Sequence, residues 1–182
     1  MTTLRTLDQS SKLKNVLYEI RGQALVEAAR LEGEGHAILK LNTGNPASFG
    51  FEAPYQIVRD MIAAMPYSHG YSDSRGILSA RRAIVNRYEE TPGFPKVDPD
   101  NVYLGNGVSE LITMTMQALL DEGDEVLIPA PDYPLWTAMT SLSGGTPVHY
   151  LCDELDGWQP DLEDIQSKIT PRTTLRASAR LV

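Results

Sequence analysis

Two glycines and a serine beside a predicted helix start give this sequence its clearest capacity for chemistry. Gly105 and Gly107 follow a short apolar run, and Ser109 stands in the first turn of the helix that the spacing of apolar residues predicts next. The first N–H groups of a helix lack intrahelical partners, and the helix dipole adds positive potential there. With the serine hydroxyl, these groups form an anion site that suits a phosphate.

Two kinds of phosphate ligand compete for this turn. A dinucleotide fingerprint needs a third glycine, but Glu110 stands in its place, where a carboxylate would crowd the helix and repel a pyrophosphate. A single phosphate needs only the turn and the hydroxyl. Tyr133 favours a flat ligand, because it follows the predicted strand 126–130 and ligands of open α/β sheets bind at that edge. The residues alone equally allow a tight turn and a packed tyrosine.

Two longer runs carry a family resemblance. The runs 104–112 (LGNGVSELI) and 129–138 (PAPDYPLWTA) resemble the class I aminotransferases, which are pyridoxal 5'-phosphate (PLP) enzymes of fold type I, and among them the bacterial alanine aminotransferases. The resemblance extends from about Ser10 to Thr173. It implies an α/β fold, incomplete, of which only the N-terminal portion is present. Its expected parts are residues 1–45 (N-terminal arm and start of the small domain), 46–173 (first part of the large PLP-binding domain) and 174–182 (divergent tail).

The resemblance implies which residues bind the cofactor. Gly107, Val108 and Ser109 match the segment that holds the PLP phosphate, and Tyr133 matches a residue that stacks on the pyridine ring. Tyr71 matches a tyrosine that reaches across a homodimer interface to the cofactor phosphate of the neighbouring subunit.

The resemblance also implies three substrate-binding residues. Gly44 matches a glycine whose backbone meets the substrate carboxylate, and Tyr18 and Arg21 match positions near the substrate pocket. Taken alone, Gly44 lies beside Asn-Pro and fits a simple turn. Tyr18 and Arg21 stand one helical turn apart, a spacing that a surface helix also explains.

The implied reaction moves an amino group between a small amino acid, such as alanine, and a 2-oxo acid, such as 2-oxoglutarate. The family's catalytic lysine is expected beyond residue 182, so the chain is predicted to hold no catalytic residue and to be inactive alone. None of its five lysines matches the family's lysine-bearing segment: Lys12, Lys14, Lys40, Lys96 and Lys168. The alternative is a non-catalytic fragment, the product of a truncated or frameshifted gene.

Composition bounds the partners and the compartment. The 182 residues carry a net charge of −8, which argues against nucleic acid or an anionic membrane as the main partner. A single cysteine, Cys152, fits a reducing compartment, and no signal segment is evident, so we expect a cytoplasmic protein. His36, His69 and His149 are expected at the surface or core edge, and no cluster has metal-ligand spacing.

Apolar patterning predicts the elements that position these residues. A helical stripe is expected to pack in the core, and it consists of Val58, Met61, Ile62 and Met65. Strands are predicted at 102–104, 126–130 and 148–151, with the last two paired and the first apart from them. A helix is predicted at 161–168. After Thr173 two arginines interrupt any apolar run, so no strand is expected there.

Overall fold

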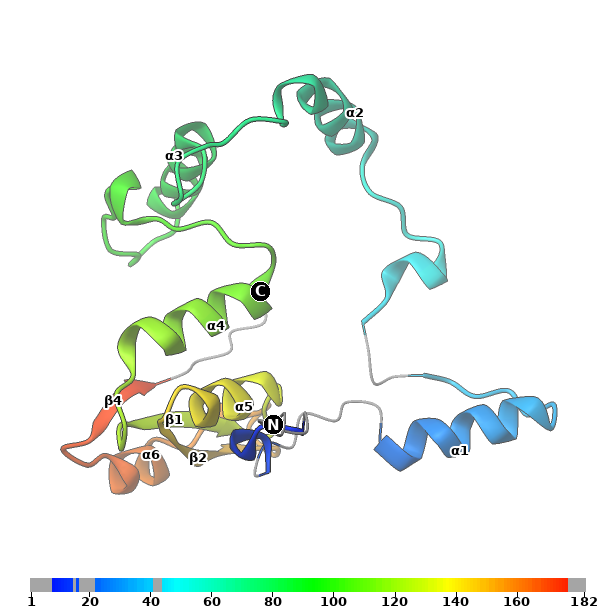
Figure 1. Ribbon diagram of the computed structural model, residues 1–182, viewed down its shortest axis with the longest axis vertical. Helices are drawn as coiled ribbons and strands as arrows, with labels where there is room; N and C mark the ends of the chain where they lie inside the picture. Colours follow the sequence, from blue (N-terminus) through cyan, green and yellow to red (C-terminus); the bar gives the residue numbers. More distant parts are fainter. Residues whose placement is uncertain (1–7, 15, 17–21, 41–43, 177–182) are drawn as a thin grey trace, which may run out of the picture. The chain divides into compact units, whose positions relative to one another are not determined.

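The computed structural model describes residues 8–14, 16, 22–40 and 44–176 (Figure 1). The chain divides into two compact units. One unit comprises Met1–Ile20 and Gly105–Val182 and is called the sheet unit here; the other, Arg21–Leu104, is called the helical unit. The expected boundaries at residues 45 and 173 come from the resemblance alone and stay a prediction.

The sheet unit is built on four strands in the order β3-β2-β1-β4. β1 is parallel to both of its neighbours, and β3 is antiparallel to β2. The elements of this unit are η1 (Ser11–Leu13), α4 (Val108–Leu119), β1 (Glu125–Ala130), α5 (Leu135–Leu142), β2 (Thr146–Asp153), β3 (Gln159–Pro160), α6 (Leu162–Lys168) and β4 (Thr173–Arg176). The predicted pairing of strands 126–130 and 148–151 is confirmed, as is the helix at 161–168.

Helices cover both faces of β1. Val126 and Ile128 are fully buried against α4 and α5, whereas Leu127, which is 1% exposed, packs on the opposite face with Tyr150 of β2 and Ile165 of α6. Figure 1 shows these three helices around the strands. Successive residues of a strand point to opposite faces, so only a continuous apolar run can fill both cores. The run Val-Leu-Ile of β1 therefore specifies a central strand.

The helix α4 buries one stripe of side chains. Ile112, Met116 and Leu120 recur every four residues and pack on β1 with exposed fractions of 2%, 1% and 8%. Leu119, which also fits helical spacing, is exposed. The buried stripe therefore ends on Leu120, the residue at which the chain leaves the helix in extended conformation.

The strand β4 corrects the expectation that no strand follows Thr173. Residues Thr173–Arg176 pair with β1 in parallel, with Val126 opposite Leu175. Leu175 packs against the α4 and α5 core. An edge strand needs apolar residues on one face only, so alternating residues suffice where an uninterrupted apolar run was expected.

The helical unit is mostly solvent-exposed in the described residues. Its elements are α1 (Gly22–Gly33), η2 (Pro46–Phe49), α2 (Tyr55–Ala64), η3 (Met65–Tyr67), α3 (Leu78–Glu89) and η4 (Pro99–Asn101). The prediction that the stripe of Val58, Met61, Ile62 and Met65 packs in a core is wrong for this structure, where the four are 40–66% exposed. An apolar stripe marks a face that can be buried, but burial needs a second element within reach.

The segment 102–104, predicted as a strand, forms none in this structure. Its ends are held by other backbone bonds instead: the Val102 N–H donates to the Pro99 carbonyl at 3.2 Å in a turn, and the Leu104 N–H donates to the Arg75 carbonyl, far away in the sequence, at 2.9 Å. A strand requires a neighbouring strand, and the described part of the helical unit contains no strand with which residues 102–104 could pair.

Candidate functional site

The turn before α4 has the geometry that the sequence predicted. Gly107 is the N-cap residue at φ +82°, a left-handed conformation that disfavours any residue with a Cβ. No atom lies within 4 Å of the position where its Cβ would stand, so the turn opens onto free space. Val108 and Ser109 follow, both exposed. The first N–H groups of α4 are therefore accessible to a ligand.

Gly105 is required for a different reason, which is close packing. A Cβ at this position would lie 2.7 Å from the Leu111 side chain and 3.3 Å from a carboxylate oxygen of Glu110. Glu110 itself folds back over the turn, and its Oε2 accepts a hydrogen bond from the Asn106 N–H. The carboxylate that argued against a dinucleotide thus satisfies one N–H of the turn. Its negative charge stays close to the turn and disfavours a polyanion there.

Tyr133 lies where β1 gives way to α5, at the carboxyl end of a central parallel strand. It follows a cis peptide bond between Ala130 and Pro131, and the residue is 42% exposed. Its carbonyl accepts a hydrogen bond from the Trp136 N–H at 3.0 Å, at the start of α5. The loops at the carboxyl ends of parallel strands are the usual ligand edge of such sheets.

A three-residue cluster lies beside Tyr133, which we call the Asp132 cluster: Asp132, Thr137 and His149. The Thr137 hydroxyl donates to Asp132 Oδ2 at 2.7 Å and lies 2.9 Å from His149 Nε2. His149 Nε2 is 3.6 Å from the same carboxylate oxygen. The three side chains come from the β1–α5 connection, α5 and β2. Sequence reasoning placed His149 at the surface or core edge and missed its partners.

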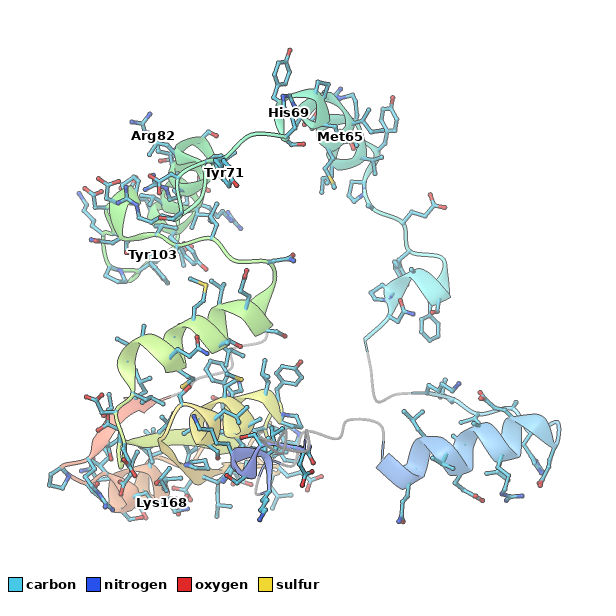
Figure 2. All side chains as sticks on the ribbon, in the orientation of Figure 1. Met65, His69, Tyr71, Arg82, Tyr103 and Lys168 are labelled. Carbon is cyan, nitrogen blue, oxygen red and sulfur yellow. The ribbon has the colours of Figure 1, made fainter. Side chains whose placement is uncertain are left out.

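Tyr71 lies in the helical unit, on the segment between α2 and α3 (Figure 2), and its side chain is fully exposed. The segment after it is fixed by charged side chains. Arg75 donates to both oxygens of Asp73, at 3.2 and 3.1 Å, and buried Arg81 donates to the Gly76 and Pro99 carbonyls at 2.9 and 2.7 Å. The hydrogen bonds from Arg75, together with the charges of Arg75 and Arg81, lower the pKa of Asp73 to about 2.

Three further predicted residues gain no support from local geometry. Gly44 is exposed, and nothing lies within 4 Å of a Cβ at its position, so its proposed approach to a substrate stays a prediction. Tyr18 and Arg21 lie outside the described residues. The structure thus brings Gly107, Val108, Ser109 and Tyr133 into one unit, whereas Gly44 and Tyr71 belong to the other.

The described ranges contain neither a metal-ligand cluster nor a membrane-spanning helix. No group of three or more histidine, cysteine, aspartate or glutamate side chains there could hold a metal ion. None of the helices described is long and apolar enough to cross a membrane.

A comparison with protein families decides which lineage this geometry belongs to. The family model described as aminotransferase class I and II matches residues 36–179. The chain belongs to this family. Its fold is accordingly the α/β fold of fold type I aminotransferases, present in part, as the resemblance predicted.

Individual relatives agree with the assignment of this aminotransferase chain. It is 73% identical over 169 residues to the alanine aminotransferase of Mycobacterium tuberculosis. The matched region covers 93% of this chain and 39% of that protein. It is 59% identical over 167 residues to the glutamate-pyruvate aminotransferase AlaA of Escherichia coli, at 92% and 41% coverage. The solved alanine aminotransferase of Pyrococcus furiosus matches with a TM-score of 0.84 at 37% identity, covering 93% of this chain and 43% of that one. The chain therefore spans about two fifths of the length of its curated relatives.

PLP is the cofactor of this family, and the residues of the α4 turn fit its phosphate end. The observation that carries the fit is the open N-terminus of α4. There Gly107 leaves space, Ser109 is exposed, and the aminotransferase chain offers backbone N–H groups without a side-chain cap at Gly107. A phosphate monoester placed there would gain charge-assisted hydrogen bonds and the field of the helix dipole.

Proposed function

We propose that this chain is the first part of an alanine aminotransferase that exchanges an amino group between alanine and 2-oxoglutarate through PLP. The observation that carries the proposal is the open, glycine-capped N-terminus of α4 in a chain 73% identical to an alanine aminotransferase over 169 residues. When bound, PLP supplies an electron sink that stabilises negative charge at the substrate α-carbon.

The residues of the sheet unit would bind and orient the cofactor. The N–H groups of Val108 and Ser109 and the Ser109 hydroxyl donate to the phosphate, beside the turn that Gly107 opens. The Tyr133 ring covers one flat face of the pyridine and excludes water from it. Both contacts fix the ring before substrate arrives, so that less orientational freedom is lost when the reaction begins.

The residues of the helical unit would act on the substrate and on a second subunit. The Gly44 backbone meets the substrate carboxylate without a side chain in the way. Tyr71, exposed beside the Asp73 bonds, reaches the cofactor phosphate of the other subunit in a homodimer. Tyr18 and Arg21, which lie outside the described residues, are assigned to substrate binding by the resemblance alone. A reducing, cytoplasmic location is proposed with this role.

The test is a hybrid enzyme. Residues 10–173 of this chain replace the matching part of the Mycobacterium tuberculosis alanine aminotransferase, and pyruvate formation from alanine and 2-oxoglutarate is measured. We expect a dimer that retains PLP and is active. A folded, PLP-loaded hybrid that is inactive with alanine but active with another amino acid would contradict the proposed substrate.

The second candidate is a non-catalytic fragment, and the surroundings of two of its lysines favour it. Lys40 Nζ lies 2.9 Å from a Glu32 carboxylate oxygen, and Lys168 Nζ lies 2.7 Å from Asp164, so both ammonium groups already have anionic partners. PLP and borohydride applied to the 182-residue polypeptide, followed by peptide mapping, separates the candidates. We expect no stoichiometric label at any lysine and no pyruvate. Labelling of one lysine together with pyruvate formation would favour an active chain.

A further inference from the structure

The Asp132 cluster is not used by any residue role proposed so far, although it lies directly beside Tyr133. Asp132 is mostly buried, with 17% of its side chain exposed, while the His149 side chain is 41% exposed. Ile128 of β1 pairs with His149 of β2, so the two side chains lie on the same face of the sheet. Since Ile128 packs toward α4 and α5, His149 is directed to the same side as Thr137.

The direction of each hydrogen bond in the cluster follows from the single hydroxyl proton of Thr137. A threonine hydroxyl carries a single hydrogen, and the Thr137 hydroxyl gives it to Asp132 Oδ2 at 2.7 Å. It can therefore only accept from His149 Nε2, at 2.9 Å, so His149 carries a proton on Nε2. This order excludes a histidine-activated nucleophile, because such a hydroxyl must donate to the imidazole. The cluster holds groups in place.

The group that it holds is the short connection from β1 to α5. This connection reads Pro131-Asp132-Tyr133-Pro134, and the two proline rings fix φ at both ends. The φ torsions that remain free are those of Asp132 and Tyr133. Thr137 lies on α5, whose residues Leu135 and Ala138 are buried in the core, so the hydroxyl that fixes Asp132 has a rigid base. Fixing Asp132 limits the backbone positions open to its neighbour Tyr133, and hence the direction in which the Cα–Cβ bond of Tyr133 points.

We propose that Asp132, Thr137 and His149 are positioning residues that hold the Tyr133 ring at the carboxyl end of β1 for stacking on a flat aromatic cofactor. The inference rests on the proposed role of Tyr133 and adds to it the residues that orient the ring. They act through Tyr133 and contribute nothing to the binding of a phosphate group, which lies at the N-terminus of α4.

This division of labour gives a test with two ligands. The 182-residue chain and its Thr137→Val variant are titrated with pyridoxine 5'-phosphate, which lacks the aldehyde that reacts with lysines, and separately with inorganic phosphate. Thr137→Val keeps the shape of the side chain and removes the hydroxyl. We expect roughly tenfold weaker binding of pyridoxine 5'-phosphate, from the loss of a charge-assisted hydrogen bond, and unchanged binding of phosphate.

Two control variants and a cofactor-free measurement complete the experiment. Thr137→Ser restores the hydroxyl and should restore wild-type binding. Ser141→Ala removes another α5 hydroxyl, which donates to the Thr137 carbonyl at 3.0 Å, and should change the binding of neither ligand. Amide hydrogen exchange of peptides covering residues 130–134, without ligand, should be faster in Thr137→Val alone.

The outcomes separate the inference from the proposed function. The positioning role is wrong if Thr137→Val changes neither the amide exchange at 130–134 nor the binding of pyridoxine 5'-phosphate. It is also wrong if the variant weakens the binding of both ligands equally. If the wild-type chain binds neither ligand, the proposed cofactor site fails. The exchange rates at 130–134 then still decide whether the cluster fixes the Tyr133 connection.

Discussion

The Thr170 hydroxyl donates a hydrogen bond of 2.6 Å to Glu125 Oε2, and this contact joins the first residue of β1 to the turn before β4. Glu125 is 5% exposed, and its N–H donates to the Arg172 carbonyl at 2.8 Å. The Thr170 bond is the main cause of a lowered Glu125 pKa, with Arg172 contributing. The same residues therefore fix the register of β4 and the charge of its anchor.

Thr170→Val should loosen β4 and lower the urea midpoint of the sheet unit. Because the folded-state pKa of Glu125 is below its ordinary value of 4.5, its contribution to stability is present above that value and is lost as the pH falls through the lowered pKa. The wild-type midpoint should therefore fall more than that of the variant on acidification from pH 6 to pH 3. Thr174→Val, which alters an exposed hydroxyl, serves as the control. Equal pH dependence in wild type and Thr170→Val would contradict the assignment.

Asp73 should give the helical unit a separate acid transition. Its folded-state pKa of about 2 lies below the ordinary 3.8, so its bonds to Arg75 and Arg81 stabilise the segment above pH 3.8 and are lost as the pH falls through about 2. The measurement is an NMR titration of the Asp73 carboxyl carbon. In Asp73→Asn, the resonances of residues 74–77 should no longer shift with pH in this range. A midpoint near 3.8 in the wild type would show that the bonds do not form.

Ser109→Ala and Tyr133→Ala should weaken cofactor binding in different ways. Ser109→Ala removes a donor to the phosphate and should weaken the binding of both inorganic phosphate and pyridoxine 5'-phosphate by ~1 kcal/mol. Tyr133→Ala should weaken the binding free energy of pyridoxine 5'-phosphate by ~1–3 kcal/mol and leave that of phosphate unchanged, since it removes only a ring contact. Isothermal titration of both ligands checks this, with Thr115→Ala on the exposed side of α4 as the control. Unchanged affinity in both variants would remove the α4 turn from the cofactor site.

Two methionines test which apolar stripe is a core. Met116 is 1% exposed beneath α5, and Met61 of α2 is 66% exposed. Met116→Ala should destabilise the chain by ~2–5 kcal/mol through a cavity, whereas Met61→Ala should stay within ~0.5 kcal/mol. Denaturant unfolding of each variant gives the two values. A large cost at Met61 would mean that α2 packs against another surface in solution.

The sequence predicted best where one local pattern determines the structure. The run Val126 to Ile128 can only be a central strand because it must fill two cores. Gly107 indicates a turn because glycine readily adopts a positive φ, which the structure has at this position. The stripe of α2 was misjudged because amphipathic spacing states which face could be buried but does not supply the partner. β4 was missed because an edge strand needs so little apolar sequence.

The Asp132 cluster could not have been predicted from spacing. Thr137 and His149 are 12 residues apart, and only the parallel register of β1 and β2 brings His149 onto the face where α5 lies. The signal present in the sequence is a polar His149 between Val148 and Tyr150, both of which pack on the opposite core. Such a residue must face a helix on the other side, but the sequence does not say which helix. The role of Gly44 stays a prediction for a related reason, since its ligand and not its neighbours would require a glycine.

The strand order places β4 at one outer edge of the sheet, parallel to β1. β1 is enclosed by β2 and β4, and the short antiparallel strand β3 lies beyond β2, so the outer edge of β4 is the parallel edge of the sheet in the described residues. β4 meets β1 with a register irregularity between Glu125 and Val126. A slip of one residue turns every side chain of a strand to the opposite face. The alignment of Thr173–Arg176 on β1 therefore decides which face of the sheet each of these four side chains meets.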